Sequence, residues 1–339
     1  MIMPRAASAS TRKLGFAAAI VLIAGGVAAR GPYGARDSDI QTAVAQAHAR
    51  YQAENSGKVS ELVSSFDAAS PATYGVVVVR VDGKVFEAGD SRVRFVMGAL
   101  AAPFTAALAA EQQGTEVRSS VAGAVAGTAP VPDARTPADF GKAPRNALTG
   151  EGAMTTLGLV TPQRDADAKW RALLANFTNF AGTGLEVDER VYRADKPIVP
   201  RVQAMARDLG TEGRLLDDPA ITADLYLRQN SLAASAHDLA VMAATLANDG
   251  VNPVTRKAVV RPEVARDLQS QLLAKRTGSS AWMSRARIPA TASISGGIIV
   301  VIPGRLGLAV YSPPLDASGV SVRGQRAIKY LSQVLFFNP

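Results

Sequence analysis

Apolar runs near both ends of the chain predict two β-hairpins. The β-branched run at residues 74–79 is followed by an Asp-Gly pair, which favours a two-residue hairpin turn, and then by a returning strand at residues 84–88. Near the C-terminus, residues 297–302 lead into a Pro-Gly pair, and residues 306–311 return. Each end of the chain is therefore predicted to supply one antiparallel hairpin.

Between and beside the hairpins, apolar residues recur at the three- to four-residue spacing of amphipathic helices. A helix at residues 37–55 is predicted before the first hairpin, and one at residues 318–337 closes the chain. Residues 115–149 are rich in Ala, Gly and Pro and lack this spacing, so we predict an irregular connection there. The helices predicted between the hairpins cover residues 150–160, 165–181, 197–210, 219–231, 236–248 and 261–275.

This order of elements predicts an α+β fold rather than a parallel, doubly wound sheet. We expect the N- and C-terminal hairpins to pair into one antiparallel sheet, with helices on both faces and a helical subdomain inserted between the hairpins. Both chain ends then contribute to one core, which makes residues 30–339 one folding unit. Within this unit we distinguish an N-terminal helix at residues 30–56 and a main domain at residues 57–339.

The first part of the chain has the pattern of a secretory signal peptide. Three basic residues, Arg5, Arg12 and Lys13, precede an apolar run at residues 14–29 that ends in small residues suited to cleavage. This run is shorter than the roughly 20 residues needed to span a bilayer. We therefore predict that residues 1–29 are removed and that the protein is periplasmic or secreted. The alternative is an uncleaved leader that tethers the protein to the inner membrane.

Composition narrows the kinds of catalytic site, metal site and partner that the chain can have. Of the 339 residues, 47% are hydrophobic and 19% are charged, as in ordinary globular proteins. The chain has no cysteine, which excludes disulfides, thiolate catalysis and cysteine metal sites. The two histidines, His48 and His237, lie far apart in the sequence, so we predict no metal site and no cofactor. The net charge of +8 is scattered rather than gathered into a stripe, so we predict no nucleic-acid partner.

Five short segments carry a resemblance to a known family. They are Val81 to Asp90, Pro144 to Asn146, Asp238 to Val254, Gly296 to Ile298 and Tyr311 to Asp316. In this order they resemble the glutaminases, whose fold is shared with serine β-lactamases and penicillin-binding proteins. The resemblance extends from about residue 57 to residue 330 and implies a β-lactamase-like fold. It also implies self-association and hydrolysis of L-glutamine to glutamate and ammonia through an acyl-enzyme.

The catalytic motif that the resemblance implies is Ser-x-x-Lys at the start of a helix. The serine attacks the substrate, and the lysine accepts its proton. In this sequence the two positions fall on Ala99 and Ala102, whose side chains can neither attack nor carry a proton. Pro103 follows directly, and its ring would clash with the carbonyl of Ala99 in a regular first turn. We therefore expect the helix to start late or with a distorted first turn.

Most other positions to which the resemblance assigns a role are also substituted. The family's Lys-Ser-Gly strand motif reads Thr-Ala-Ser at residues 291–293. The positions implied to bind substrate fall on Gly150, Val191, Ile198, Arg276 and Ile294, where the first four replace an asparagine, a glutamate, an asparagine and a tyrosine.

One polar position is retained. Tyr226 matches a family tyrosine that lines the substrate pocket, although an aromatic packed at a helix interface explains it equally well. Three nearby polar residues, Ser293, Ser295 and Glu151, could in principle replace the lost groups. We interpret them as surface or loop residues, because no lysine accompanies the serines in the sequence.

Together these substitutions predict a protein that does not hydrolyse glutamine. Removing the nucleophile of a serine hydrolase lowers turnover by on the order of 10⁶. A β-lactamase or peptidase activity is excluded on the same grounds, because no lysine in the chain is followed by Ser-Gly or Thr-Gly. We predict an exported binding or scaffold protein whose ligand the sequence does not identify. The alternative is an active or altered glutaminase.

Overall fold

The computed structural model describes residues 36–60, 70–113, 148, 150–194, 198–274 and 287–335. The predicted leader at residues 1–29 lies outside these residues, as does nearly all of the predicted irregular connection at 115–149. None of the helices in the described ranges is both long enough and apolar enough to cross a membrane.

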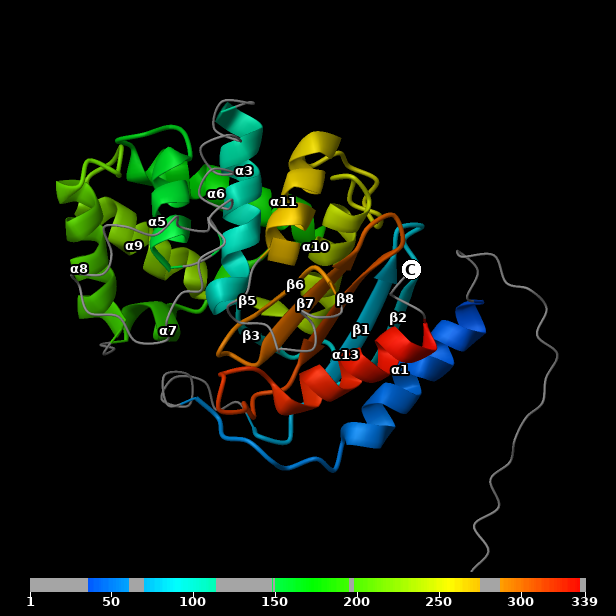
Figure 1. The fold of residues 1–339 in the computed structure, drawn as a ribbon. Helices are drawn as coiled ribbons and strands as arrows, with labels where there is room; N and C mark the ends of the chain where they lie inside the picture. The colour runs from blue at the N-terminus through cyan, green and yellow to red at the C-terminus, as the bar shows by residue number, and fades with distance from the viewer. Residues whose placement is uncertain are drawn as a thin grey trace, which may run out of the picture. The chain divides into compact units, whose positions relative to one another are not determined.

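The centre of the fold is a five-stranded antiparallel sheet with the strand order β2-β1-β8-β7-β6 (Figure 1). Strands β1 and β8 pair along their whole length, with Gly75 opposite Tyr311 and Arg80 opposite Leu306, so the N-terminal and C-terminal hairpins are joined side by side. This confirms the predicted sheet. Its strands are β1 (Gly75–Arg80), β2 (Val85–Gly89), β6 (Ala290–Ala292), β7 (Gly297–Ile302) and β8 (Leu306–Tyr311).

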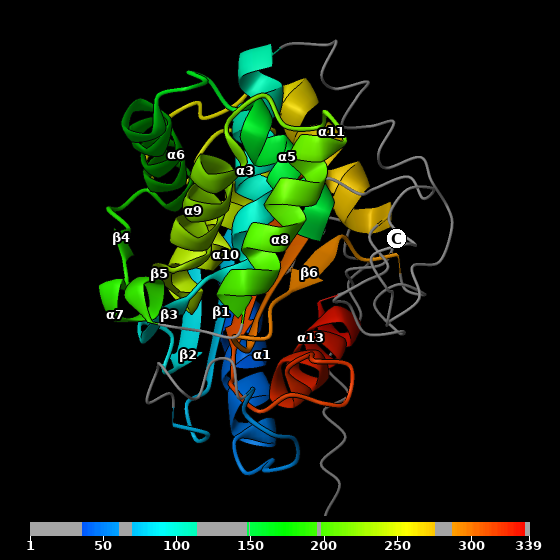
Figure 2. The ribbon, with the colours of Figure 1, turned by 90° about the vertical axis from the view of Figure 1, so that its left-hand side faces the viewer.

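Helices cover both faces of this sheet, and each face has its own apolar core. Alternate residues of a strand point to opposite faces. Val76 and Val78 accordingly pack under α1 (Asp37–Tyr51) and α13 (Val322–Val334), whereas Val77 and Val79 face α10 (Ala236–Ala247) and its neighbours (Figure 2). Helix α1 ends at Tyr51, four residues before the predicted end, and α13 begins at Val322, four residues after the predicted start.

Helix α10 lies directly on the sheet. All its residues except His237 are buried, and most are small or apolar. The close approach requires Gly307 on β8, because a Cβ at that position would lie 2.1 Å from the backbone nitrogen of Ala244. The helix begins at Ser235, whose hydroxyl accepts a hydrogen bond from the backbone N–H of Asp238 (3.2 Å), while the Asp238 carboxylate accepts one from the N–H of Ser235 (2.8 Å).

The six helices predicted between the hairpins are present, with boundaries within one or two residues of expectation, whereas a short helix at Glu189–Arg193 was not predicted. A second sheet, with the order β3-β5-β4, was not predicted. Its strands have four residues or fewer, too short for a periodic pattern to show in the sequence. The helices are α3 (Ala102–Gln113), α5 (Gly150–Leu159), α6 (Ala166–Ala181), α7 (Glu189–Arg193), α8 (Ile198–Thr211), α9 (Pro219–Asn230) and α11 (Pro262–Ala274), and the strands are β3 (Arg94–Val96), β4 (Glu186–Val187) and β5 (Leu232–Ser235).

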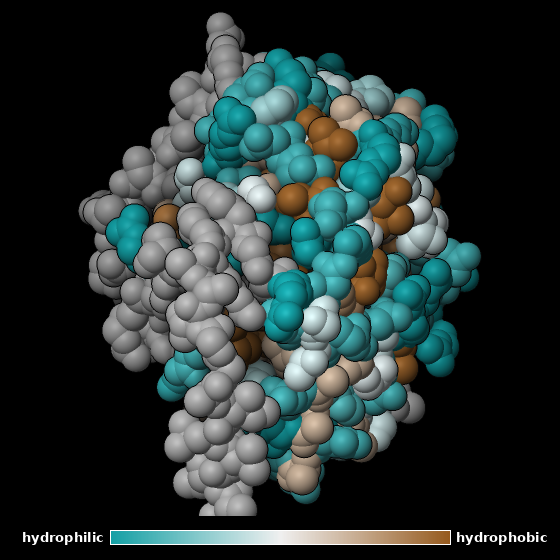
Figure 3. Space-filling model, turned by 90° about the vertical axis from the view of Figure 1, so that its right-hand side faces the viewer, coloured by the Kyte–Doolittle hydropathy of each residue, from teal (hydrophilic) through white to brown (hydrophobic). Residues whose placement is uncertain are grey.

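Apolar side chains on the surface are dispersed. On the face shown in Figure 3 they alternate with polar residues and do not merge into one patch. Single exposed apolar residues are normal in globular proteins, and they do not mark a binding surface. The large apolar side chains most exposed in the described ranges come from separate parts of the fold: Val93, Leu216, Val254, Ile294 and Val334.

The contact between α10 and β8 makes a stability prediction. Replacing Gly307 by alanine forces a methyl group into the backbone of α10, so we expect a loss of about 3 kcal/mol or more in the free energy of unfolding. The matched control is Gly184→Ala, because a Cβ there would have no neighbour within 4 Å. Urea unfolding followed by circular dichroism measures both variants. Equal stability of the two would show that the packing at Gly307 is not constrained.

Candidate functional site

The predicted catalytic positions lie on a short 3₁₀ turn, η1 (Gly98–Ala101), that leads into α3. The N–H of Leu100 donates to the carbonyl of Met97 (3.1 Å), and the N–H of Ala102 donates to the carbonyl of Ala99. Pro103 is then the second residue of the α-helix, where its missing N–H removes no helical hydrogen bond. The expected distortion of the first turn is therefore confirmed. Ala99 is exposed and Ala102 is buried.

The turn is held against the sheet by a tight contact at Gly98. Gly98 has a φ of +54°, a conformation that suits glycine, and a Cβ there would lie 2.6 Å from Oγ of Ser293. Behind the turn, Gly297 leaves room for Leu100 and for the ring of Phe95. The start of α3 is thus fixed by direct packing on the turn between β6 and β7.

Three serines at this end of the sheet, Ser293, Ser295 and Ser312, are buried. Ser293 and Ser295 lie in the turn between β6 and β7, so the predicted loop position is confirmed, whereas they are not on the surface. The N–H of Ser295 donates to Oγ of Ser293 (3.3 Å). In the described part of the chain, the hydroxyls of Ser295 and Ser312 have no hydrogen-bond partner. None of the hydrogen bonds described for these hydroxyls involves a basic or acidic side chain. A serine without a base is a weak nucleophile, so the described contacts of these residues give them no activating group.

On the helical side, two of the predicted binding positions pack on one small apolar cluster, and a third, Gly150, lies beside Met205 at its edge. Gly150 is the first residue of α5, and a Cβ there would lie 3.8 Å from the sulfur of Met205 on α8. Ile198, Met205 and Tyr226 pack on this cluster from its edge. The cluster itself consists of Met154, Val202, Ala206, Leu209 and Ala223.

The remaining predicted positions lie elsewhere. Val191 is buried on α7, where its N–H donates to Oδ1 of Asp188 (3.2 Å). Glu151, which we interpreted as a surface or loop residue, lies on α5 with its side chain mostly buried and 3.7 Å from Arg214. Ile294 is 44% exposed in the turn between β6 and β7. Arg276 lies outside the described residues.

Tyr226 packs between the small cluster and the main core, as an aromatic at a helix interface does. Burial raises the pKa of its phenol above the ordinary value, against the opposing effect of a hydrogen bond with Asn230. The phenol therefore stays protonated at neutral pH and can donate a hydrogen bond. Its role in lining a pocket remains a prediction.

A buried hydrogen bond beside Ala102 connects α3 to α9. Oγ1 of Thr105 donates to Oε1 of Gln229 at 2.7 Å, and both side chains are fully buried. Thr105 is one helical turn beyond Ala102, and residues three apart share a helix face. Sequence reasoning missed this pair, because nothing in the pattern relates two residues so far apart in the chain.

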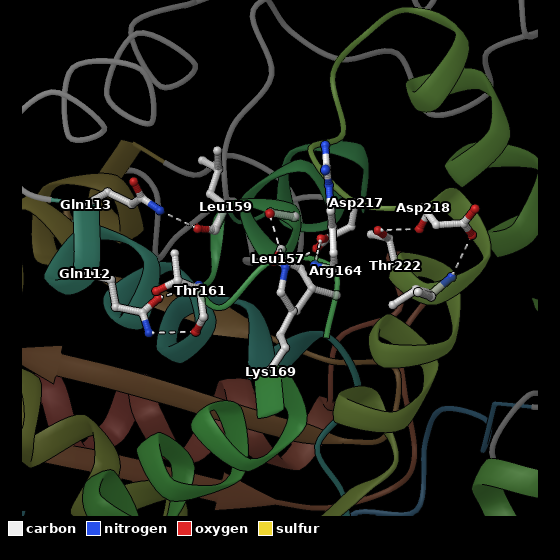
Figure 4. Close-up of polar contacts among 12 residues, drawn as sticks. Gln112, Gln113, Leu157, Leu159, Thr161, Arg164, Lys169, Asp217, Asp218 and Thr222 are labelled. Atoms are coloured by element: carbon white, nitrogen blue, oxygen red, sulfur yellow. Dashed lines mark hydrogen bonds and ion pairs between the residues drawn. The ribbon is translucent and has the colours of Figure 1, made fainter. Parts of the chain in front are cut away.

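Sequence reasoning also missed a buried ion pair in the helical part of the fold, between Lys169 on α6 and Asp217 before α9 (Figure 4). The ammonium of Lys169 also donates to the carbonyls of Gly158 (3.2 Å) and Leu157 (3.4 Å), at the end of α5. The N–H of Arg164 donates to the second oxygen of Asp217 (2.7 Å). One pair thus joins α5, α6 and the start of α9.

This arrangement also decides whether Lys169 is a candidate base. Burial lowers the pKa of Lys169 below its ordinary value, while its hydrogen bond to Asp217 and the charge of that carboxylate act in the opposite direction. Its ammonium is engaged by Asp217 and by the carbonyls of Leu157 and Gly158, and none of its described hydrogen bonds involves a hydroxyl that could act as a nucleophile. Among the described residues, no group of three His, Asp or Glu side chains is placed to hold a metal ion.

Comparisons with known proteins agree with the sequence resemblance. The family model for glutaminases matches residues 57–338. Glutaminase 1 of Bradyrhizobium diazoefficiens is 36% identical over 288 residues, an alignment that covers 83% of this chain but only 46% of that longer protein. The glutaminase of Parabacteroides distasonis is 31% identical over 305 residues, covering 89% of this chain and 94% of that protein. The solved structure of the probable glutaminase YbaS superposes with a TM-score of 0.82 at 29% identity, covering 90% of this chain and 99% of that one.

The pair of Lys169 and Asp217 makes a second stability prediction. Their side chains are 1% and 2% exposed, so Lys169→Met leaves a buried carboxylate without its counter-charge. We expect a loss of about 3–5 kcal/mol in the free energy of unfolding. The matched control, Lys169→Met combined with Asp217→Leu, should recover most of this loss because it leaves no unpaired charge. Denaturant titration tests this, and a double variant as unstable as the single one would contradict it.

Proposed function

The chain belongs to the glutaminase family, and on that premise we propose that it is a member that does not hydrolyse glutamine and acts instead as an exported binding or scaffold protein. Its fold is the β-lactamase-like α+β fold expected from the sequence. The observation that carries the proposal is the turn η1, in which Ala99 and Ala102 occupy the positions of the nucleophile and its base. Neither side chain has an atom that can take part in acyl transfer.

The surroundings of the turn supply no substitute. Ser293, Ser295 and Ser312 are buried and have no basic partner among the described residues, and Lys169 is held by Asp217. A site without a nucleophile retains only the rate enhancement that binding and backbone hydrogen bonds provide, which leaves turnover lower by on the order of 10⁶. The local backbone, by contrast, is closely packed against Ser293 at Gly98. These observations favour a protein that keeps the fold around the motif but lacks the catalytic side chains.

The helical side of the site supports the same proposal. Ile198 and Tyr226 pack on a cluster whose described members are all apolar or small, and Gly150 lies beside Met205 at its edge. Free glutamine carries an ammonium and a carboxylate, and burying either without a partner costs several kcal/mol. The cluster itself therefore offers no counter-charge to either group of glutamine.

The alternative is an active or altered glutaminase that converts L-glutamine to L-glutamate and ammonia. It draws support from two relatives that are named glutaminase. Their alignments cover 83% and 89% of this chain. It requires a nucleophile other than the residue at position 99. The two proposals therefore differ in a single measurable quantity, the release of ammonia.

An ammonia-release assay with L-glutamine tests the proposal. We expect the purified chain to release no more ammonia than a heat-inactivated sample, because it has no nucleophile at position 99. Variant Ala99→Ser/Ala102→Lys restores both groups and should release ammonia measurably faster than the unmodified chain. The glutaminase of Parabacteroides distasonis serves as the positive control. Turnover of 1 s⁻¹ or more by the unmodified chain, an ordinary enzyme rate, would overturn the proposal.

Export is tested by the mass of the mature protein. We expect the full-length chain, produced in a bacterium with two membranes, to be recovered from the periplasm without residues 1–29, with Arg30 as its first residue. Intact-protein mass spectrometry of the periplasmic and membrane fractions measures this. A full-length mass confined to the membrane fraction would instead establish the uncleaved tether.

A further inference from the structure

Arg228 on α9 is a half-buried arginine whose guanidinium lies over the ring of Trp170 on α6. Its Cζ atom is 4.2 Å from the ring centroid, well within the range of a cation–π interaction. Trp170 is only 6% exposed, so the indole is held in the core. Helices α6 and α9 lie with α7 on one side of the helical part of the fold (Figure 2). The stacked ring therefore restricts where the guanidinium can lie.

The nitrogens of this guanidinium have no hydrogen-bond or ion-pair partner within the described ranges. Its Nε is enclosed by protein, whereas Nη1 and Nη2 remain in contact with solvent. Arginine donates through a rigid planar fork, and two of its N–H groups match the two oxygens of a carboxylate. The outer end of the fork is therefore open to a ligand.

The acid best placed to pair with Arg228 is engaged elsewhere. Asp224 lies one turn earlier on α9, at the spacing that favours an ion pair. Its Oδ1 instead accepts a hydrogen bond from Oη of Tyr192 on α7 (2.5 Å). Burial and this hydrogen bond raise the pKa of Tyr192 to about 12, whereas the charge of Arg228 acts in the opposite direction. The phenol therefore keeps its proton at neutral pH and continues to hold Asp224.

We propose that Arg228 binds the carboxylate of a ligand through Nη1 and Nη2, and that Tyr192 keeps this site open by engaging Asp224. A singly charged carboxylate suits the site better than phosphate, because the charge of Asp224 repels a second negative charge more strongly. Residues two apart on a helix do not face each other, so this site is separate from the cluster at Tyr226. The proposal goes beyond the proposed function and does not depend on whether glutamine is hydrolysed.

Apolar side chains beside the site indicate the character of the rest of the ligand. Leu174 lies one turn after Trp170 on α6, and Ile221 lies two turns before Arg228 on α9, so each shares a helix face with a residue of the site. Both side chains are half-buried against the main core. We therefore expect a carboxylate that carries a short apolar group.

Titration with sodium propionate at constant ionic strength tests the proposal. The chain has two tryptophans, so a Trp282→Phe variant leaves a single indole N–H signal in the NMR spectrum, that of Trp170. We expect a saturable shift of this signal with a dissociation constant on the order of 1–10 mM. Propionamide has the same shape without the charge and should cause no shift. Equal shifts with both compounds would overturn the proposal.

Two further probes define the ligand class. Acetyl-trialanine carries its carboxylate at the end of a peptide, so tighter binding than propionate would assign the site to a peptide C-terminus. Weaker binding than propionate would assign it to a small free acid. Inorganic phosphate should bind less tightly than propionate. Tighter binding of phosphate would overturn the assignment to a carboxylate.

Substitution of Arg228 examines the guanidinium itself. Arg228→Gln should weaken propionate binding at least tenfold, and Arg228→Lys, which keeps the charge but loses the fork, should weaken it less. The matched control is Arg193→Gln, because Arg193 is an exposed arginine on α7 that pairs with Glu189. Binding should be unchanged in this control. Equal affinities in the Arg228→Gln and Arg193→Gln variants would show adventitious binding and overturn the proposal.

Two variants that leave Arg228 in place test the role of Tyr192, and they decide the question if the Arg228 variants do not fold. Tyr192→Phe frees Asp224 to pair with Arg228, so propionate should bind about threefold more weakly. Asp224→Asn removes the nearby negative charge and should strengthen binding about threefold. A change in the same direction in both variants, or no change in either, would overturn the proposal that Tyr192 keeps the site open.

Discussion

The fold depends on the contact between the backbone of α10 and the backbone of β8 at Gly307. This contact places the buried helix on the central strands. The segments that connect to α10 then fix the position of the candidate site. Strand β5 leads into the N-cap of α10 at Ser235 and pairs with β3, which ends two residues before the turn η1. The N–H of Met97 then donates to the carbonyl of Leu232 (2.8 Å), so the position of α10 determines where Ala99 lies.

Much of this fold could be predicted from the sequence, because the apolar pattern of a long strand or helix indicates which of its residues are buried. The four long strands and the helices of the insert match their apolar patterns to within a few residues. The second sheet could not be predicted, because its strands are short and gain their stability from neighbours distant in sequence. The same holds for Lys169 and Asp217, which are 48 residues apart. A lysine in a polar stretch gives no sign that it will be buried.

The candidate site could be predicted only in part. The motif located Ala99 and Ala102 at the two catalytic positions. The geometry of proline predicted the distorted turn before Pro103. Burial at Ser293 and Val191 did not, because it depends on contacts between the turn, the sheet edge and α7. The place of β6 at the end of the strand order likewise emerges only from the pairing of the strands. The substitutions at the motif can thus be seen in the sequence, whereas the packing around them is seen only in the structure.

The central claim is that no residue of this chain forms an acyl-enzyme with glutamine. The most direct measurement is the intact mass of the protein after brief mixing with excess L-glutamine and quenching in acid, which preserves an ester intermediate. The Parabacteroides distasonis glutaminase, treated identically, is the reference. The account predicts a mass unchanged from that of the untreated chain. A glutamyl adduct on any residue of the chain would contradict it.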